Sequence, residues 1–412
     1  MALIAESKGF NSPDDDGTDC TTLTSSVWGS EAPKTHLVFG QGNGANSIYT
    51  NIKNSIGWSD GTDNVAIGVG SQNNAATTVC NRTHQTSYNI YPLSNNGGIY
   101  ESAVQSSYNA SPPKICHTWS NSANDGYNYF LMALGGDDVE NISIDQIQTK
   151  TSTGLQSYTG PGFKPDFLIC LGVASLSTLP YADAHMVCQF GMSDGSTDAG
   201  YYNASIDGQG VQSKTYSVQS SNFIHVLDGN ANDQVVAGGK SLDSNGYTLN
   251  YTDVSSAMRV TVIAVKGPAA KVIATTQPTS NTTNDLNAGF VPKAGICVGS
   301  MKTASETGSS HNRFSIGTWD EQNNMDSGGW MDEHGQSTTD VDRYISNTHS
   351  IVNYNHSQSV VGKATVAANG NGIRETWTNT DGSEYKHAWL LLGDKPEDPV
   401  STLNPAFMLF LE

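Results

Sequence analysis

The feature that most constrains this chain is an internal repeat, in which four landmarks recur three times in the same order along 412 residues. The first landmark is an apolar run between a proline and a glycine seven residues later, at 33–40, 165–172 and 292–299. The others are a glycine followed three residues later by aspartate, a single basic residue, and an aromatic residue sixteen positions before a closing glycine. In chain order these positions are Gly57, Gly191 and Gly317, with Asp60, Asp194 and Asp320; then Arg82, Lys214 and Arg343; then Trp119, Tyr251 and Trp377. Chance does not hold four landmarks in register, so the chain is three diverged copies of a unit of about 130 residues.

Each copy consists of short apolar runs rich in valine, isoleucine, tyrosine and threonine, bounded by clusters of glycine, asparagine, aspartate and serine. This pattern is typical of strands and turns, and no stretch keeps a helical period long enough for a major helix. We therefore predict an all-β chain of three tandem antiparallel β-sandwich or jelly-roll-like domains. The fourth landmark predicts a hairpin whose second strand, continuously apolar, is central in its sheet.

Composition turns polar after each closing glycine, which places boundaries near 137–140 and 267–271. The predicted copies are 1–137, 138–268 and 269–394, opening with strands within 8–30, 141–160 and 272–288. A tail, 395–412, contains an apolar run with Phe407 and Phe410. Two interpretations of the tail remain open, a last strand that closes copy three or an arm that docks on a neighbouring subunit, because either would cover an apolar edge.

The net charge of −19 and the scattering of the 20 basic residues exclude a phosphate-tracking surface, so no nucleic acid is expected as a partner. The first ten residues lack the features of a signal peptide, and no apolar stretch approaches the length of a membrane helix. We therefore expect a soluble protein made in the cytoplasm. The six cysteines show no metal-binding spacing, and we interpret them as buried reduced thiols.

The segments around 162–170, 189–195 and 243–267 carry a family resemblance. They read GFKPDFLIC, QFGMSDG and DSNGYTLNYTD followed by RVTVIAVKG, which resembles a repeat of tailed-bacteriophage structural proteins and related prophage genes. The resemblance covers all three copies and is clearest in the second. It implies a virion component, such as a head-decoration protein, a head fibre or a tail-associated protein, and it implies no catalytic residues.

No sequence constellation indicates catalysis, since the chain has no G-x-S-x-G elbow, H-E-x-x-H helix or P-loop. The dispersed histidines, among them His185, His225 and His387, recur with no partner at matching repeat positions, which favours a structural role. The recurrent aspartates are interpreted as turn residues whose carboxylates accept backbone N–H groups. Two oxygen-rich loops, 14–19 and 228–233, resemble incomplete calcium loops and are interpreted as solvated turns, with a weak structural cation as the alternative. We predict no catalytic, cofactor or metal site.

Candidate contacts with partners come from four features, and the first two of them have two interpretations each. The recurrent cations Arg82, Lys214 and Arg343 form either an ion pair inside each copy or a contact with an acidic neighbour or a glycan. The landmark aromatics form either core packing or a sugar-stacking platform. Trp330, with Asn323 and Asn324, is expected in exposed loops that could bind sugar, and Phe407 and Phe410 could dock on a neighbour.

The leading functional hypothesis is a non-enzymatic virion protein, most simply a capsid decoration protein that contacts the major capsid protein or other virion proteins. Three copies in one chain could then occupy a threefold position as a fused trimer would. The alternative is a tail- or fibre-associated adhesin that binds host surface glycans. A third interpretation, a glycoside hydrolase, would require two carboxylates facing one cleft, which the sequence does not indicate.

Overall fold

The computed structural model describes residues 2–41, 47–94, 96–122, 127–174, 179–210, 212–228, 232–303, 306, 309–355 and 357–396. Within these residues the chain is all-β, and its one α-helix is the single turn α1 (Ser25–Trp28). Every strand pairing between named strands is antiparallel, as the short alternating and apolar runs predict. The all-β prediction is therefore confirmed.

Three large sheets have the same strand order. The first is β1 (Ile4–Asn11), β10 (Asn128–Gly135), β3 (Pro33–Gln41), β5 (Ile52–Ser59), β6 (Asn64–Ser71), β7 (Cys80–Gln85) and β14 (Tyr181–Ala184). The second is β11 (Asn141–Gln148), β21 (Arg259–Lys266), β13 (Phe167–Gly172), β15 (Met186–Ser193), β16 (Asp198–Ser205), β17 (Thr215–Ser220) and β25 (Ser309–Ser310). The third is β22 (Ala269–Thr276), β32 (Lys386–Gly393), β24 (Pro292–Gly299), β26 (Asn312–Asp320), β27 (Met325–Asp332), β28 (Val341–Ser346) and β4 (Ser47–Thr50).

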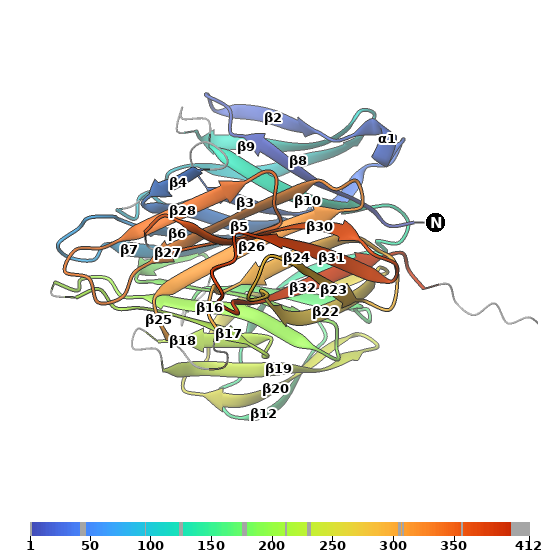
Figure 1. The fold of residues 1–412 in the computed structure, drawn as a ribbon. Coiled ribbons are helices and arrows are strands. Elements are labelled where there is room, and N and C mark those ends of the chain that lie inside the picture. The colour runs from blue at the N-terminus through green and yellow to red at the C-terminus, as the bar shows by residue number, and fades with distance from the viewer. Residues whose placement is uncertain are drawn as a thin grey trace, which may run out of the picture.

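Three smaller sheets cover the outer faces of the large ones. They are β2 (Gly17–Thr22), β9 (Pro113–Asn121) and β8 (Ser102–Ala110); β12 (Gly154–Tyr158), β20 (Gly246–Val254), β19 (Asp233–Asp243) and β18 (Ile224–Leu227); and β23 (Thr283–Asn287), β31 (Gly372–Thr378), β30 (Val360–Ala368) and β29 (Ile351–Tyr354). In Figure 1 the β2-β9-β8 sheet lies at the top and the β12-β20-β19-β18 sheet at the bottom, with strands of the large sheets between them. We call β1–β10, β11–β21 and β22–β32 the first, second and third segments.

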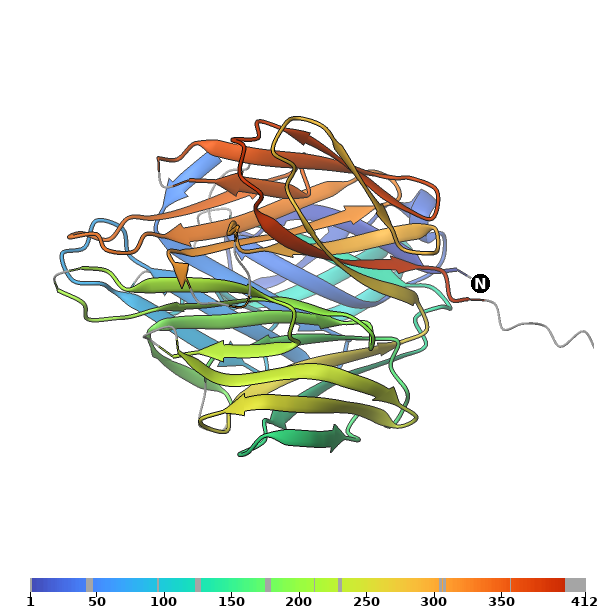
Figure 2. The same cartoon turned by 60° about the horizontal axis from the view of Figure 1, so that its bottom comes forward.

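The three segments pack against one another around a common core, as Figure 2 shows by colour, with blue to cyan, green to yellow and orange to red side by side. One large hydrophobic cluster contains inward-facing residues of all three large sheets, for example Phe39, Phe190 and Phe314. Three further clusters lie between each large sheet and its own small sheet. Trp119, Tyr251 and Trp377 are buried in these outer clusters, which confirms their interpretation as core packing.

The expected hairpin at the fourth landmark is wrong. Strand β20, which carries Tyr251, pairs with β12 and β19 in the small sheet, whereas β21 pairs with β11 and β13 in the large sheet. The chain therefore crosses from one sheet to the other between these strands. The expectation that the last strand is central is confirmed, because β21 lies between two neighbours and has apolar cores on both faces.

Two of the six cysteines form a disulfide, Cys20–Cys116, so the interpretation of all six as reduced thiols is wrong. The pair could not be recognised from spacing, because it depends on the register that places Cys20 of β2 opposite Cys116 of β9. The other four, Cys80, Cys170, Cys188 and Cys297, are free and buried, as expected.

The disulfide predicts the number of reactive thiols. Unfolded without reductant, the protein is expected to expose four thiols to an aromatic disulfide reagent, and six after reduction. Absorbance of the released thiolate measures both values. Six thiols before reduction, in protein purified without reductant and with iodoacetamide-treated protein as the blank, would contradict the pairing.

Candidate functional site: the strand-exchange joints

Each large sheet is completed by a short strand from another segment. Strand β14 of the second segment pairs with β7 of the first, β25 of the third with β17 of the second, and β4 of the first with β28 of the third. The exchange therefore closes into a ring of three. We call the three pairings exchange joints one, two and three, numbered by the segment that receives the strand.

A residue with left-handed backbone follows each exchanged strand. These residues are Asn51 (φ 64°), His185 (φ 69°) and His311 (φ 73°). At each of them the chain leaves the neighbouring sheet and at once enters the next strand of its own sheet, β5, β15 or β26. Asparagine and histidine adopt this conformation more readily than most non-glycine residues, which explains their presence at these positions.

The carbonyl of each left-handed residue is bound by the strand that receives the exchange. Arg343 Nη1 donates to Asn51 O at 2.6 Å and to Thr50 O at 3.2 Å. Arg82 Nη1 donates to Ala184 O at 2.7 Å and to His185 O at 3.0 Å, while Nη2 donates to Ala174 O at 3.0 Å. A buried carbonyl needs such a donor, and a charged donor makes the stronger bond.

The sequence grouped Lys214 with the two arginines, and the strand register corrects this. Arg82 and Arg343 pair opposite Val69 and Trp330, the sixth residues of their neighbouring strands. The residue opposite the sixth residue of β16, Asn203, is Ser217. Ser217 Oγ donates to His311 O at 2.9 Å, so serine does at joint two what arginine does at the others.

The side chains of Arg82 and Arg343 are 6% and 2% exposed. An ion pair inside each copy does not describe these two arginines, because their main hydrogen bonds go to backbone carbonyls of another segment. Arg82 also has an ion pair with Asp183 of β14 at 3.3 Å. Contact of Arg82, Lys214 or Arg343 with a separate molecule remains a prediction.

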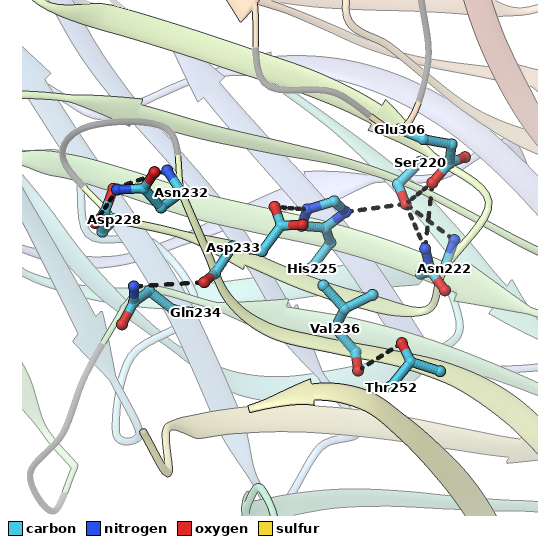
Figure 3. Close-up of polar contacts among 10 residues, drawn as sticks. All are labelled: Ser220, Asn222, His225, Asp228, Asn232, Asp233, Gln234, Val236, Thr252 and Glu306. Carbon is cyan, nitrogen blue, oxygen red and sulfur yellow. Dashed lines mark hydrogen bonds and ion pairs between the residues drawn. The ribbon is translucent and has the colours of Figure 1, made fainter. Parts of the chain in front are cut away.

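A chain of polar side chains reinforces joint two (Figure 3). Glu306, which precedes β25, accepts hydrogen bonds from Ser220 Oγ at 2.9 Å and from the backbone N–H of Ser221 at 2.6 Å. His225 lies between Ser220 and Asp233, with Nδ1 at 3.1 Å from Ser220 Oγ and Nε2 at 2.7 Å from Asp233 Oδ1. The third segment is thereby fastened to the second.

Serine, histidine and aspartate in a line resemble a nucleophilic triad, but the bonding here differs. A nucleophilic serine must give its proton to the imidazole. Ser220 Oγ lies within hydrogen-bond distance of the Glu306 carboxylate, a competing acceptor, and it accepts from both the backbone N–H and the side-chain amide of Asn222 at 3.1 and 3.0 Å. The arrangement supports a structural network at the joint. No local pattern in the sequence marks Glu306 or Ser220, because their neighbours come from distant strands.

The recurrent aspartates act as turn residues, as predicted, and two of them also link segments. Asp60, Asp194 and Asp320 each accept two backbone N–H groups of their own turn through Oδ1. Asp194 Oδ2 accepts the N–H of Val272 at 2.9 Å, and Asp320 Oδ2 accepts that of Ser7 at 2.8 Å. Burial acts to raise the pKa of Asp194, but hydrogen bonds from Ser196, Val272 and Thr197 outweigh it and lower that pKa.

The last residues of β6, β16 and β27 are equivalent in the three sheets, and they are Ser71, Ser205 and Asp332. All three are buried, and Asp332 interacts with both serines. Burial raises the pKa of Asp332 to about 7, and the hydrogen bonds from Ser205 and Ser71 only partly oppose this shift. One of three equivalent positions thus carries a titratable group inside the common core.

Asp332 predicts a pH-dependent stability. An unfolded aspartate loses its proton near pH 3.9, whereas folded Asp332 keeps it to about pH 7, so stability falls as pH rises between these values. Asp332→Asn is expected to gain about 1–2 kcal/mol relative to wild type between pH 5.5 and pH 8. Urea unfolding at both pH values measures this. Asp15→Asn, at an exposed position, controls for net charge, and parallel pH profiles of wild type and Asp332→Asn would refute the prediction.

The remaining predicted contacts lie apart from the joints. The expectation that Trp330 is exposed in a loop is wrong, because it is fully buried on β27, 4.3 Å from Phe314 between ring centroids. Asn323 and Asn324 are exposed, in the turn between β26 and β27. Phe407 and Phe410 lie outside the described residues. The middle of the 228–233 loop also lies outside them, and at the two sides of that gap Asp228 accepts hydrogen bonds from Asn232.

Among the described residues, no cluster of three or more histidine, cysteine, aspartate or glutamate side chains could hold a metal ion. The same part of the chain contains no helix with the length and apolarity needed to cross a membrane. The chain matches no protein-family model, and no curated protein or solved structure is significantly similar to it.

Proposed function

We propose that this chain is a non-enzymatic structural protein of a tailed-bacteriophage virion, assembled in the host cytoplasm, and most simply a capsid decoration (auxiliary head) protein. It consists of three β-sandwich or jelly-roll-like domains at 1–137, 138–268 and 269–394, followed by the tail 395–412. Its partners are the major capsid protein or other virion proteins.

The observation that carries this proposal is the closed ring of strand exchange. Each segment completes the large sheet of another, so one chain has the architecture of an intertwined trimer. A protein with approximate threefold symmetry can make equivalent contacts with the three capsid subunits around a threefold or local threefold position. The recurrent polar residues support the same role, because they bind backbone groups within the chain.

The test is the number and position of the copies in purified particles. Quantitative mass spectrometry with isotope-labelled peptides is expected to give about one copy of this chain for every three copies of the major capsid protein. Cryo-electron microscopy is expected to place the chain at threefold positions. A count comparable with that of a tail component, or absence from particles, would overturn the assignment.

The second candidate is a tail- or fibre-associated adhesin that binds glycans. It is favoured by a groove between the first and third segments that Asn323 and Asn324 help to line. Copy number separates the two candidates, since an adhesin at a tail tip is present in few copies per particle.

A further inference from the structure

An open groove of about 760 Å³ lies where the first segment meets the third. Its walls are strand β1 and the start of β10 on one side, and the β26–β27 turn and the end of β28 on the other. Five asparagine residues line it, namely Asn11, Asn128, Asn323, Asn324 and Asn347. The volume is in the range of ligand-binding sites.

The equivalent place between the second and third segments is much smaller. A cavity of about 190 Å³ remains there, lined by Ala274 and Thr275 in the positions that Gly9 and Phe10 occupy in the first segment. Gly9 is thus the one glycine among three equivalent positions, the others being Asp145 and Ala274. The absence of a side chain at Gly9 helps to keep the groove open.

The wall of the groove also departs from the internal symmetry. Thr318 and Asp326 are paired across β26 and β27. The equivalent cross-strand pairs are Trp58–Val65 and Met192–Ala199, all four apolar and in the common core. Only where the first and third segments meet are these residues polar.

These polar groups form a connected network at the groove. Ser7 Oγ lies 2.7 Å from Thr318 Oγ1 and donates to Asp326 Oδ2 at 2.7 Å. Asp326 lines the groove although it is only 6% exposed, and burial raises its pKa to about 6. Burying polar groups where two equivalent sites carry apolar ones costs stability, and such exceptions to local consistency are expected at functional sites.

The chemistry of the lining selects the kind of ligand. Side-chain amides and hydroxyls both donate and accept hydrogen bonds, and they suit a ligand rich in hydroxyl groups. The lining has one cation, Lys8, and one carboxyl group, Asp326, so it offers little to a strongly charged ligand. The ring of Phe10 stacks on His117 and Tyr129 within the first segment, so the amide and hydroxyl groups, and not an aromatic surface, define the ligand.

We infer that the groove between the first and third segments is a binding site for a neutral oligosaccharide. The site requires only this chain, so it is independent of the proposed position on the capsid. A decoration protein with this site would present one saccharide site per chain.

The test uses the purified full chain on a microarray of linear neutral oligosaccharides of glucose, galactose and N-acetylglucosamine, with sialylated and uronate-containing chains as the acidic arm. Calorimetry with the neutral oligosaccharide that binds most strongly then compares variants. Gly9→Leu is expected to weaken binding at least about tenfold. A Cβ at Gly9 meets Asp326 Oδ1 at 3.5 Å, an ordinary contact, so the backbone has room for a Cβ on the side of Gly9 that faces Asp326.

Two further variants make the test decisive. Ala274→Leu, at the equivalent exposed position of the third segment, is expected to bind as wild type does. Asn323→Gly, which keeps the left-handed backbone (φ 64°) and removes only an exposed amide, is expected to weaken binding several-fold. Binding of acidic chains alone, no binding to any oligosaccharide, or Gly9→Leu and Asn323→Gly both binding as wild type would each overturn the inference. None of these outcomes affects the copy number in particles, which tests the proposed function separately.

Discussion

Replacement of Gly317 by alanine is expected to lower the free energy of unfolding by at least about 3 kcal/mol, or to prevent folding. A Cβ on Gly317 would overlap the carbonyl oxygen of Ser350, and the same overlap occurs between Gly57 and Asn89 O, and between Gly191 and Phe223 O. Each of these carbonyls lies just before the chain reaches the small sheet of its segment. There the backbone passes directly over the glycine of the large sheet, and no room is left for a methyl group. The recurrence of this glycine in the sequence therefore has a steric cause.

Urea unfolding of Gly317→Ala beside Gly210→Ala measures the effect. At Gly210 a Cβ meets only Thr77 Oγ1, at 3.9 Å, and the backbone φ is not positive, so that variant should stay within about 0.5 kcal/mol of wild type. Equal stability of the two variants would show that the crossing is not tight.

Arg343→Met is expected to cost about 2–4 kcal/mol, because it removes the buried guanidinium that donates to the carbonyls of Thr50 and Asn51 in a partly buried joint. Methionine keeps much of the apolar stem, so the loss reports mainly the hydrogen bonds. The matched variant is Lys214→Met, half-buried just outside β17, which is expected to change stability by no more than about 0.5 kcal/mol.

Hydrogen exchange followed by mass spectrometry gives a second readout for Arg343→Met. Amides of β4 are expected to exchange faster in this variant, while those of β14 at joint one keep their protection. Equal loss of stability in Arg343→Met and Lys214→Met would restore the grouping that spacing suggested and contradict the register of β17. Unchanged protection of β4 would show that the arginine does not hold the exchanged strand.

Much of the local structure could be predicted from the sequence. Apolar runs that open at Pro33 and Pro292 are strands β3 and β24, the recurrent aspartates cap turns, and the continuously apolar β21 is central. These features depend on residues close together in the chain, so their patterns are visible without a partner. Spacing alone gave the wrong equivalent at Lys214, because the residue in register with Arg82 and Arg343 is Ser217, three positions later. A difference of three residues in loop length shifts the spacing without disturbing the strands on either side.

The candidate sites could be predicted only in part. Arg82, Arg343, Asn323 and Asn324 were singled out, and the structure places the first two at the exchange joints and the last two beside the groove. Ser217, Glu306 and Asp326 were missed. Their importance depends on which segment lies opposite, as with Asp326 and Ser7, and no local pattern carries that information.

The sequence by itself determined that this protein is three copies of one β-unit, because the repeat is visible when the chain is aligned with itself and needs no knowledge of which residues are in contact. Only the tertiary structure decided that the copies exchange strands in a ring, that Cys20 meets Cys116, and that two equivalent core positions remain apolar where the third is polar and open. The physical reason is that strand propensity and turns are local, whereas sheet edges are completed by whichever unpaired strand lies within reach. In this chain that strand comes from another copy, as β4 does when it pairs with β28.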